Sequence, residues 1–302
     1  MTERPSPSGR AFRRTALPLL AVAVLVAIVW AVYAARTRTI FDTASEFGRV
    51  RVLERGDGLR TLVTGEGRAR QSAIHPGRPL HLELAYTRVG MIGLALLPPE
   101  GRMLFVGLGG GAMPMYARQI VPEARIDVVE IDPVIVDVAR RYFGFTTDDR
   151  MTVHTGDGRA FIESAQPGTY DLIVLDAFSD DEVPYALTTR EFLRAVRAIL
   201  TPGGVVVSNL WSRNDAFAAM IATYQDVFEE VHLVRVPRHA QYILVASASG
   251  RSLDRERLAG AARELGARRS LGFDLSRLVS EGYESAPRSP AAVLRDTAAA
   301  RE

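Results

Sequence analysis

The sequence contains no cysteine and no lysine. The absence of cysteine excludes disulfides, thiolate nucleophiles and thiolate zinc sites. The absence of lysine excludes Schiff-base chemistry, a lysine general base and a P-loop lysine. All 37 basic residues are therefore arginine, and 35 acidic residues nearly balance them to a net charge of +2. This balance argues against a uniformly basic nucleic-acid-binding protein, and 47% hydrophobic residues over 302 positions indicate a globular chain of one or two domains.

One stretch near the N-terminus, residues 16–35 (ALPLLAVAVLVAIVWAVYAA), carries no charge and has arginines on both flanks. A helix of about 20 apolar residues can cross ~30 Å of hydrocarbon. The sequence therefore predicts a transmembrane helix that attaches the chain to the cell membrane as a single-pass anchor. A cleaved signal peptide and a buried helix are the alternatives. Because the arginine counts of the two flanks nearly balance, the membrane face of the remaining chain stays open.

From residue 102 onward, short apolar runs alternate with amphipathic stretches. Five of these runs read as buried strands: 103–109, 125–132, 151–157, 170–177 and 205–210. Two further runs, 231–237 and 241–248, are separated by only three residues, which permits only an antiparallel hairpin. The alternation predicts a doubly wound, mainly parallel α/β sheet of seven strands, with ligands bound at the carboxyl ends of the strands.

The remaining segments differ from this alternating region in their residue pattern and indicate how the chain divides into domains. Short alternating strands broken by glycines predict a small β-hairpin domain over 40–80. A Rossmann-like catalytic domain is expected over 81–250 and a C-terminal helical extension over 251–285. Residues 1–15 form an N-terminal tail, and residues 286–302, which have few large apolar groups, are expected to be a loose tail.

A glycine-rich turn follows the first predicted strand and precedes a helix. Gly107, Gly109 and Gly111 let the backbone turn tightly and approach a ligand without a Cβ in the way, and the helix start offers free N–H groups. Glu130 ends the next strand, where a carboxylate can accept both hydroxyl hydrogens of a ribose. This arrangement predicts a nucleoside ligand. The alternative is that the glycines only permit a tight strand-to-helix turn.

Two more acids end the third and fourth predicted strands. Asp157 can accept from an exocyclic adenine amine, cap the helix that begins at Gly158, or do both. Asp176 either faces the ligand crevice or caps a loop. Acids at the ends of three neighbouring strands suit a ligand with a ribose, an adenine and a cationic centre. They are less natural for the pyrophosphate of a nicotinamide dinucleotide.

The blocks VGLGGGAMP, VVEIDP, HTGDGRAF, YDLIVLDAF and LTPGGVVVSN, in this order, resemble the spermidine synthase (polyamine aminopropyltransferase) family. The resemblance extends to TLVTGEGRARQSA and LELAY before the sheet, and spans residues 47–248. It implies a class I S-adenosylmethionine-dependent methyltransferase-like fold. It also implies decarboxylated S-adenosylmethionine as co-substrate, or S-adenosylmethionine itself, with no metal. A polyamine such as putrescine is the implied acceptor, and a homodimer stays open.

The resemblance also implies roles for individual residues. Asp176 would be the catalytic acid–base residue, and Tyr86 would orient the acceptor amine. The residues implied to bind the donor are Gln71 at the aminopropyl end, Gly107, Gly109 and Gly111 at the methionine-derived part, Glu130 at the ribose, and Asp157 with Gly158 at the adenine.

Three departures from the family pattern reduce the negative charge expected around a diamine. Ala112 stands where the family usually has an aspartate, and Arg88 replaces an acid two residues after Tyr86. The family's second acid after the catalytic one is displaced, so Asp180 or Asp181 either restores it at the substrate or caps a loop. Two other functions therefore remain open: a methyltransferase of the same fold, and a nucleoside- or polyamine-binding module without turnover.

Overall fold

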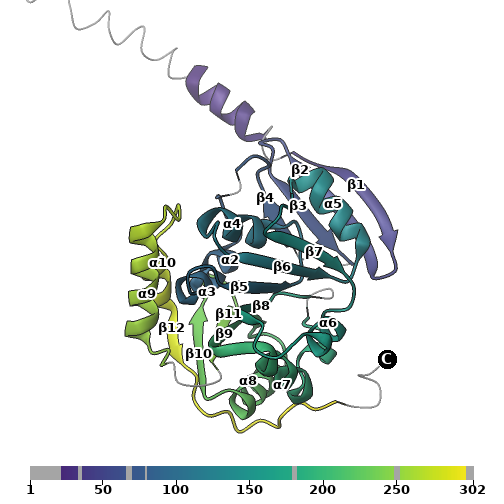
Figure 1. Ribbon diagram of the computed structural model, residues 1–302. Helices are drawn as coiled ribbons and strands as arrows, with labels where there is room; N and C mark the ends of the chain where they lie inside the picture. The colour runs from purple at the N-terminus through teal and green to yellow at the C-terminus, as the bar shows by residue number, and fades with distance from the viewer. Residues whose placement is uncertain are drawn as a thin grey trace, which may run out of the picture.

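The computed structural model describes residues 22–32, 36–65, 70–78, 80–178, 182–247 and 252–296 (Figure 1). Its centre is an eight-stranded sheet in the order β12-β10-β11-β9-β8-β5-β6-β7. The strands are β5 (Arg102–Val106), β6 (Arg125–Glu130), β7 (Met151–Thr155), β8 (Tyr170–Leu175), β9 (Leu200–Trp211), β10 (Glu230–Arg235), β11 (Gln241–Ser247) and β12 (Tyr283–Ser285). The five strands from β7 to β9 are parallel, and β11, β10 and β12 pair antiparallel. The mainly parallel sheet is confirmed, but it has eight strands instead of seven because β12 adds to the edge of β10.

Helices cover both faces of this sheet. They are α2 (Ala85–Gly90), α3 (Ile92–Leu96), α4 (Ala112–Ile120), α5 (Pro133–Phe143), α6 (Gly158–Ser164), the 3₁₀ turn η1 (Tyr185–Leu187), α7 (Arg190–Ile199), α8 (Phe217–Val227), α9 (Arg255–Arg268) and α10 (Leu275–Gly282). Successive residues of a strand point to opposite faces. Met103 and Phe105 of β5 therefore join the core beneath α4, α5 and α9, whereas Leu104 joins the core beneath α6, α7 and α8. Because both faces are buried, the strands read as continuous apolar runs.

A second sheet of four antiparallel strands lies beside α5, in the order β1-β2-β3-β4 (Figure 1). Its strands are β1 (Thr37–Ser45), β2 (Gly48–Arg55), β3 (Arg60–Thr64) and β4 (Arg70–Ile74). Polar contacts hold it to α5: Ser45 Oγ donates to Oδ2 of Asp132, the N-cap of α5, at 2.6 Å, and Arg60 donates to the Tyr142 carbonyl at 2.7 Å. This sheet therefore forms one wall of any cavity at the ends of β5 and β6.

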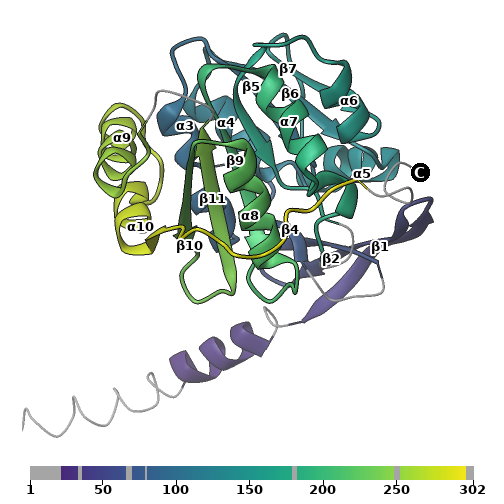
Figure 2. The ribbon, with the colours of Figure 1, turned by 90° about the horizontal axis from the view of Figure 1, so that it is seen from below.

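The predicted transmembrane helix needs correction. Residues 22–32 form a helix that projects away from the two sheets (Figure 2). At ~1.5 Å per residue this helix is roughly 16 Å long, which is about half the ~30 Å thickness of a bilayer's hydrocarbon core. Among the residues described here, no helix has both the length and the apolar character needed to cross a membrane. The prediction of a membrane span over 16–35, and of the anchor built on it, is therefore wrong for these residues. Positions 16–21 and 33–35 lie outside the described part of the chain.

The C-terminal segment also differs from the loose tail expected over 286–302. As far as Asp296 it runs across α8 and α7, drawn in yellow in Figure 2. Gln225 of α8 donates to the Ala286 carbonyl at 3.2 Å, and the Leu294 carbonyl accepts from the Arg190 N–H of α7 at 2.9 Å. Hydrogen bonds from two helices to its backbone carbonyls hold this segment in place. Residues 297–302 are not among those described.

Candidate active site

A cavity of about 350 Å³ lies at the carboxyl ends of β5, β6 and β8, bounded on one side by the N-terminal sheet. Most of the residues that the sequence singled out line it: Gln71, Tyr86, Gly107, Gly109, Glu130, Asp157, Gly158 and Asp176. The three acids at the strand ends thus share one cavity, as the parallel sheet predicts. Asp180 and Asp181 lie outside the described residues.

The glycines of the β5–α4 turn serve different purposes. Gly107 has φ +98°, and a Cβ there would lie 2.5 Å from the Asp176 carbonyl oxygen, so only glycine lets this turn approach the end of β8. Gly111 is the left-handed N-cap of α4, and a Cβ would meet the Phe145 ring at 2.5 Å. Gly111 is not part of the cavity lining. The structure therefore gives Gly111 a packing role, whereas Gly107 and Gly109 border the cavity.

Glu130 connects β6 to this turn. One carboxylate oxygen accepts the Leu108 N–H at 2.9 Å, and the other accepts the Asp132 N–H at 3.1 Å. Burial raises the pKa of Glu130, and these backbone donors oppose the rise. The carboxylate is therefore fixed in orientation and retains lone pairs on the cavity side that can accept ribose hydroxyls.

Asp157 has the capping role that the sequence left open. Its Oδ1 accepts the Ala160 N–H at 2.7 Å, which makes it the N-cap of α6. A Cβ on Gly158 would lie 2.7 Å from Val106 Cγ1, so glycine lets α6 begin directly against β5. Both residues also line the cavity, so the capping role and a ligand-binding role are compatible here.

Asp176 has two side-chain donors. The Tyr86 hydroxyl donates to Oδ2 at 3.2 Å, and Asn209 Nδ2 donates to Oδ1 at 3.1 Å. Burial raises the pKa of Asp176 to about 7, while the hydrogen bonds from Asn209 and Tyr86 act to lower it. Burial and the Asp176 charge raise the pKa of Tyr86, so its hydroxyl stays protonated. A carboxyl with a pKa near neutrality can both accept and release a proton.

Asn209 and its neighbour Gln241 were not among the residues predicted from the sequence. Asn209 lies near the end of β9, and its Oδ1 accepts from Gln241 Nε2 of β11 at 3.4 Å. Because the amide oxygen is engaged in this way, the Asn209 NH₂ faces Asp176. The only signal in the sequence was an asparagine closing the mostly apolar run VVVSN; its burial is known from the structure.

A second cavity of about 330 Å³ adjoins the first and shares Gln71, Tyr86 and Phe178 with it. Its other lining residues are Arg55, Leu59, Arg70, Ala73, Glu83, Leu84, Ala85, Asn209, Trp211, His239 and Gln241. Both donors to Asp176 therefore border this cavity, while the carboxylate itself borders the first. The two cavities therefore meet at Tyr86, whose hydroxyl donates to Asp176.

The arginines that line the second cavity are not the one that the sequence suggested, Arg88. Arg88 lines neither cavity, because its guanidinium donates to the Leu82 carbonyl at 2.7 Å and to the Glu83 carbonyl at 3.1 Å. The arginines that do line the second cavity are Arg55, paired with a neighbouring aspartate, and Arg70. Within the described chain, no group of acidic, histidine or cysteine side chains could hold a metal ion.

Comparison with known proteins agrees with this architecture. Residues 93–251 match the spermine/spermidine synthase domain. A polyamine aminopropyltransferase of Vibrio vulnificus is 40% identical over 157 residues, which cover 51% of this chain and 52% of that protein. The chain thus spans about half the length of this relative. A polyamine aminopropyltransferase of Chromobacterium violaceum is 30% identical over 241 residues, covering 78% of this chain and 90% of that protein.

A methyltransferase is also similar. The crystal structure of human methyltransferase-like protein 13 in complex with SAH is 31% identical, with a TM-score of 0.57, and covers 63% of this chain and 93% of that one. Transferases of two kinds are therefore similar to this chain. The synthase domain covers more than half of the chain, and the Chromobacterium relative is matched over nearly its whole length. The chain belongs to the spermine/spermidine synthase family.

Proposed function

We propose that this protein is an aminopropyltransferase that moves the aminopropyl group of decarboxylated S-adenosylmethionine to a polyamine such as putrescine. The observation that carries the proposal is the position of Asp176, which borders the first cavity while its two donors, Tyr86 and Asn209, border the second. A donor in one cavity and an amine in the other would meet at this carboxylate. The homodimer stays a prediction.

The donor would occupy the first cavity. Glu130 and Asp157 would accept hydrogen bonds from its ribose and adenine, and the turn at Gly107 and Gly109 would lie against its sulfur end. Gln71 would contact the aminopropyl group, which is consistent with its position at the junction of the two cavities. The sulfonium makes the adjoining propyl carbon an electrophile, and the carboxylates favour its positive charge.

The acceptor amine would enter the second cavity as an ammonium, which has no lone pair. Ionised Asp176 accepts one proton, and the neutral nitrogen attacks the propyl carbon. A C–N bond forms and the C–S bond breaks, with its electron pair going to sulfur, so that neutral methylthioadenosine leaves. Tyr86 and Asn209 hold both oxygens of Asp176, which keeps the carboxylate oriented during the transfer.

A methyltransferase is the second candidate, and specific residues favour it. Ala112 lines the first cavity where an acid would bind the donor's amine, and Arg70 lines the second cavity. Both reduce the attraction for cationic groups. The similarity to a human methyltransferase also supports an S-adenosylmethionine-type ligand without deciding which group is transferred.

The deciding experiment incubates the purified full-length chain with putrescine and decarboxylated S-adenosylmethionine, and in parallel with methyl-labelled S-adenosylmethionine. Release of methylthioadenosine together with spermidine supports the proposal. Label transfer to the amine without methylthioadenosine selects the methyltransferase. Binding of either nucleoside without product, unchanged in Asp176→Asn, selects a binding module. Asp137→Asn is the matched control, because Asp137 forms only an exposed ion pair with Arg141 on α5.

A further inference from the structure

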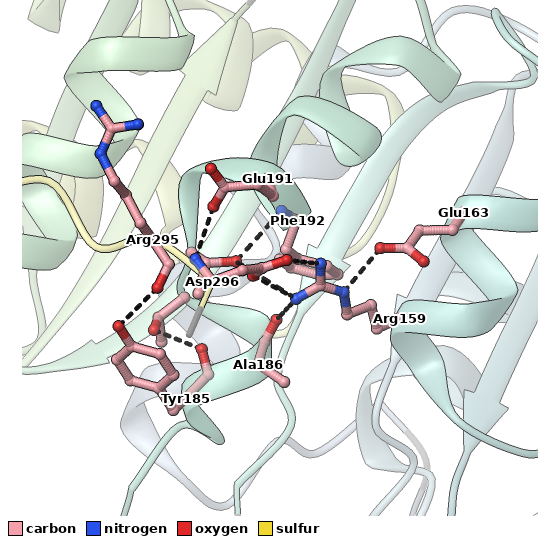
Figure 3. A network of polar contacts seen from close by, with 10 residues as sticks. Arg159, Glu163, Tyr185, Ala186, Glu191, Phe192, Arg295 and Asp296 are labelled. Atoms are coloured by element: carbon pink, nitrogen blue, oxygen red, sulfur yellow. Dashed lines mark hydrogen bonds and ion pairs between the residues drawn. The ribbon is translucent and has the colours of Figure 1, made fainter. Parts of the chain in front are cut away.

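The C-terminal strap, defined here as residues 286–296, ends in a polar network (Figure 3). This network includes Ala186, which lines the first cavity. Its last residue, Asp296, forms a two-pronged ion pair with Arg159 of α6, at 2.8 Å to Oδ1 and 2.6 Å to Oδ2. Thr189 Oγ1 also donates to Oδ1 at 2.7 Å. The side chains of Asp296 and Arg159 are only 6% and 14% exposed. A buried pair with this geometry fixes the position of both partners.

This ion pair joins two walls of the nucleoside cavity. Arg159 is the second residue of α6, directly after Asp157 and Gly158, which line that cavity. The same guanidinium donates to the Ala186 carbonyl of η1 at 3.1 Å, and Ala186 lines the cavity as well. Asp296 therefore holds a side chain that links the start of α6 to η1.

The strap holds η1 at one further point and α7 at another. The Tyr185 hydroxyl donates to the Arg295 carbonyl at 2.8 Å, and the Asp296 N–H donates to Glu191 of α7 at 2.9 Å. Leu187, at the end of η1, also lines the cavity. None of the strap residues lines either cavity. The strap therefore reaches the cavity walls indirectly, through its contacts to η1 and, by way of Arg159, to α6.

We infer that Asp296, acting through Arg159, is a positioning residue for the nucleoside end of the donor, because it fixes η1 against α6 on the side where Asp157 lies. The inference rests on the proposed function only in taking an adenosyl compound as the ligand, and it holds equally for aminopropyl and methyl transfer. It assigns to the strap a role in the affinity for donor, separate from the proton transfer at Asp176.

The test measures binding of methylthioadenosine and S-adenosylhomocysteine by calorimetry, together with KM values for donor and acceptor. Asp296→Asn keeps the shape of the side chain but removes its charge. We expect weaker nucleoside binding and a higher donor KM, by on the order of tenfold because a wall of the site is displaced. The acceptor KM and kcat are expected to stay within about twofold. Glu281→Gln is the control, since its exposed pair with Arg277 lies on α10.

A second variant covers the case in which Asp296→Asn fails to fold. Tyr185→Phe removes only the hydroxyl that donates to Arg295, from a side chain that is partly exposed. A smaller rise in nucleoside Kd, about threefold, is expected. Unchanged nucleoside affinity in a folded Asp296→Asn, or a fall in kcat with no change in donor KM, would overturn the inference. If the unmodified protein binds neither nucleoside, the proposed function fails instead.

Discussion

Replacing Asp176 by asparagine should remove turnover and increase stability at the same time. The carboxylate is the proposed proton acceptor, and the amide cannot take its place. General base catalysis contributes ~10²–10⁴-fold, so we expect kcat to fall by roughly 10³-fold, about 4 kcal/mol of activation free energy. The amide fits the site because the Tyr86 hydroxyl can accept from the new NH₂ and redirect its own proton to the Gln71 carbonyl, 3.4 Å away.

The stability change follows from the pKa of Asp176, which is about 7 in the folded protein and ~3.9 in an unfolded chain. A raised folded pKa means that the folded state binds the proton more tightly. Protonated Asp176 therefore stabilises the folded protein, and this contribution is complete below about pH 4 and is lost as the pH rises through about 7. At ~1.4 kcal/mol per unit, the upper limit is about 4 kcal/mol. Because the carboxyl borders an open cavity, we expect about 1–2 kcal/mol.

Asp176→Asn does not carry this penalty. Urea unfolding should therefore show it to be more stable than the unmodified protein at pH 8 by about 1–2 kcal/mol, with the difference shrinking towards pH 4. Methylthioadenosine release measures turnover on the same samples. A variant that keeps a tenth or more of the original kcat, or that is less stable at pH 8, would refute the reasoning. Asp137→Asn should change neither quantity, since its ion pair is exposed.

Three further outcomes are expected. Gly107→Ala should lower the free energy of unfolding by about 2–3 kcal/mol, because φ is +98° and the new Cβ would meet the Asp176 carbonyl. Nucleoside binding, measured by calorimetry, should be lost. In the control Gly168→Ala, where the new Cβ has open space around it, the free energy of unfolding should fall by only about 1 kcal/mol. Tyr86→Phe removes a hydrogen bond that lowers the pKa of Asp176. The pH–rate profile for the acceptor should therefore move to higher pH, and kcat should fall about tenfold. A profile that does not move argues against Asp176 as the base. Arg70→Gln should raise kcat/KM for putrescine several-fold by removing ~0.5–1 kcal/mol of repulsion, and the donor KM should not change. An unchanged kcat/KM for putrescine would show that Arg70 does not face the acceptor.

The shared position of the three acids could be predicted because it depends only on local patterns. Each of Glu130, Asp157 and Asp176 ends a predicted strand, and carboxyl ends of parallel strands meet at one edge of the sheet. Gly107 was predictable for the same reason, since a tight turn after a strand needs a residue without a Cβ. Ligand roles for these residues stay predictions.

Other features needed the three-dimensional arrangement. Arg88 was read as a charge in the acceptor site, but the fold directs its guanidinium to backbone carbonyls at the start of its own helix. Asn209 and Gln241 meet because β9 and β11 pair antiparallel, with Asn209 opposite Ile243 and Gln241 opposite Trp211. The two side chains are therefore diagonal neighbours, although they lie 32 residues apart in the sequence. Hydropathy alone suggested a membrane span over 16–35, and the helix described there covers only 22–32.

The sequence by itself determined the parallel sheet, the glycine turn and the acids at the strand ends, because hydrophobic period and residue type act over a few neighbouring positions. Only the tertiary structure decided which side chains orient Asp176 and where the C-terminal strap lies. Asn209 and Asp296 acquire their partners from segments distant in the chain. Such contacts depend on the geometry of packed layers, which no local pattern specifies.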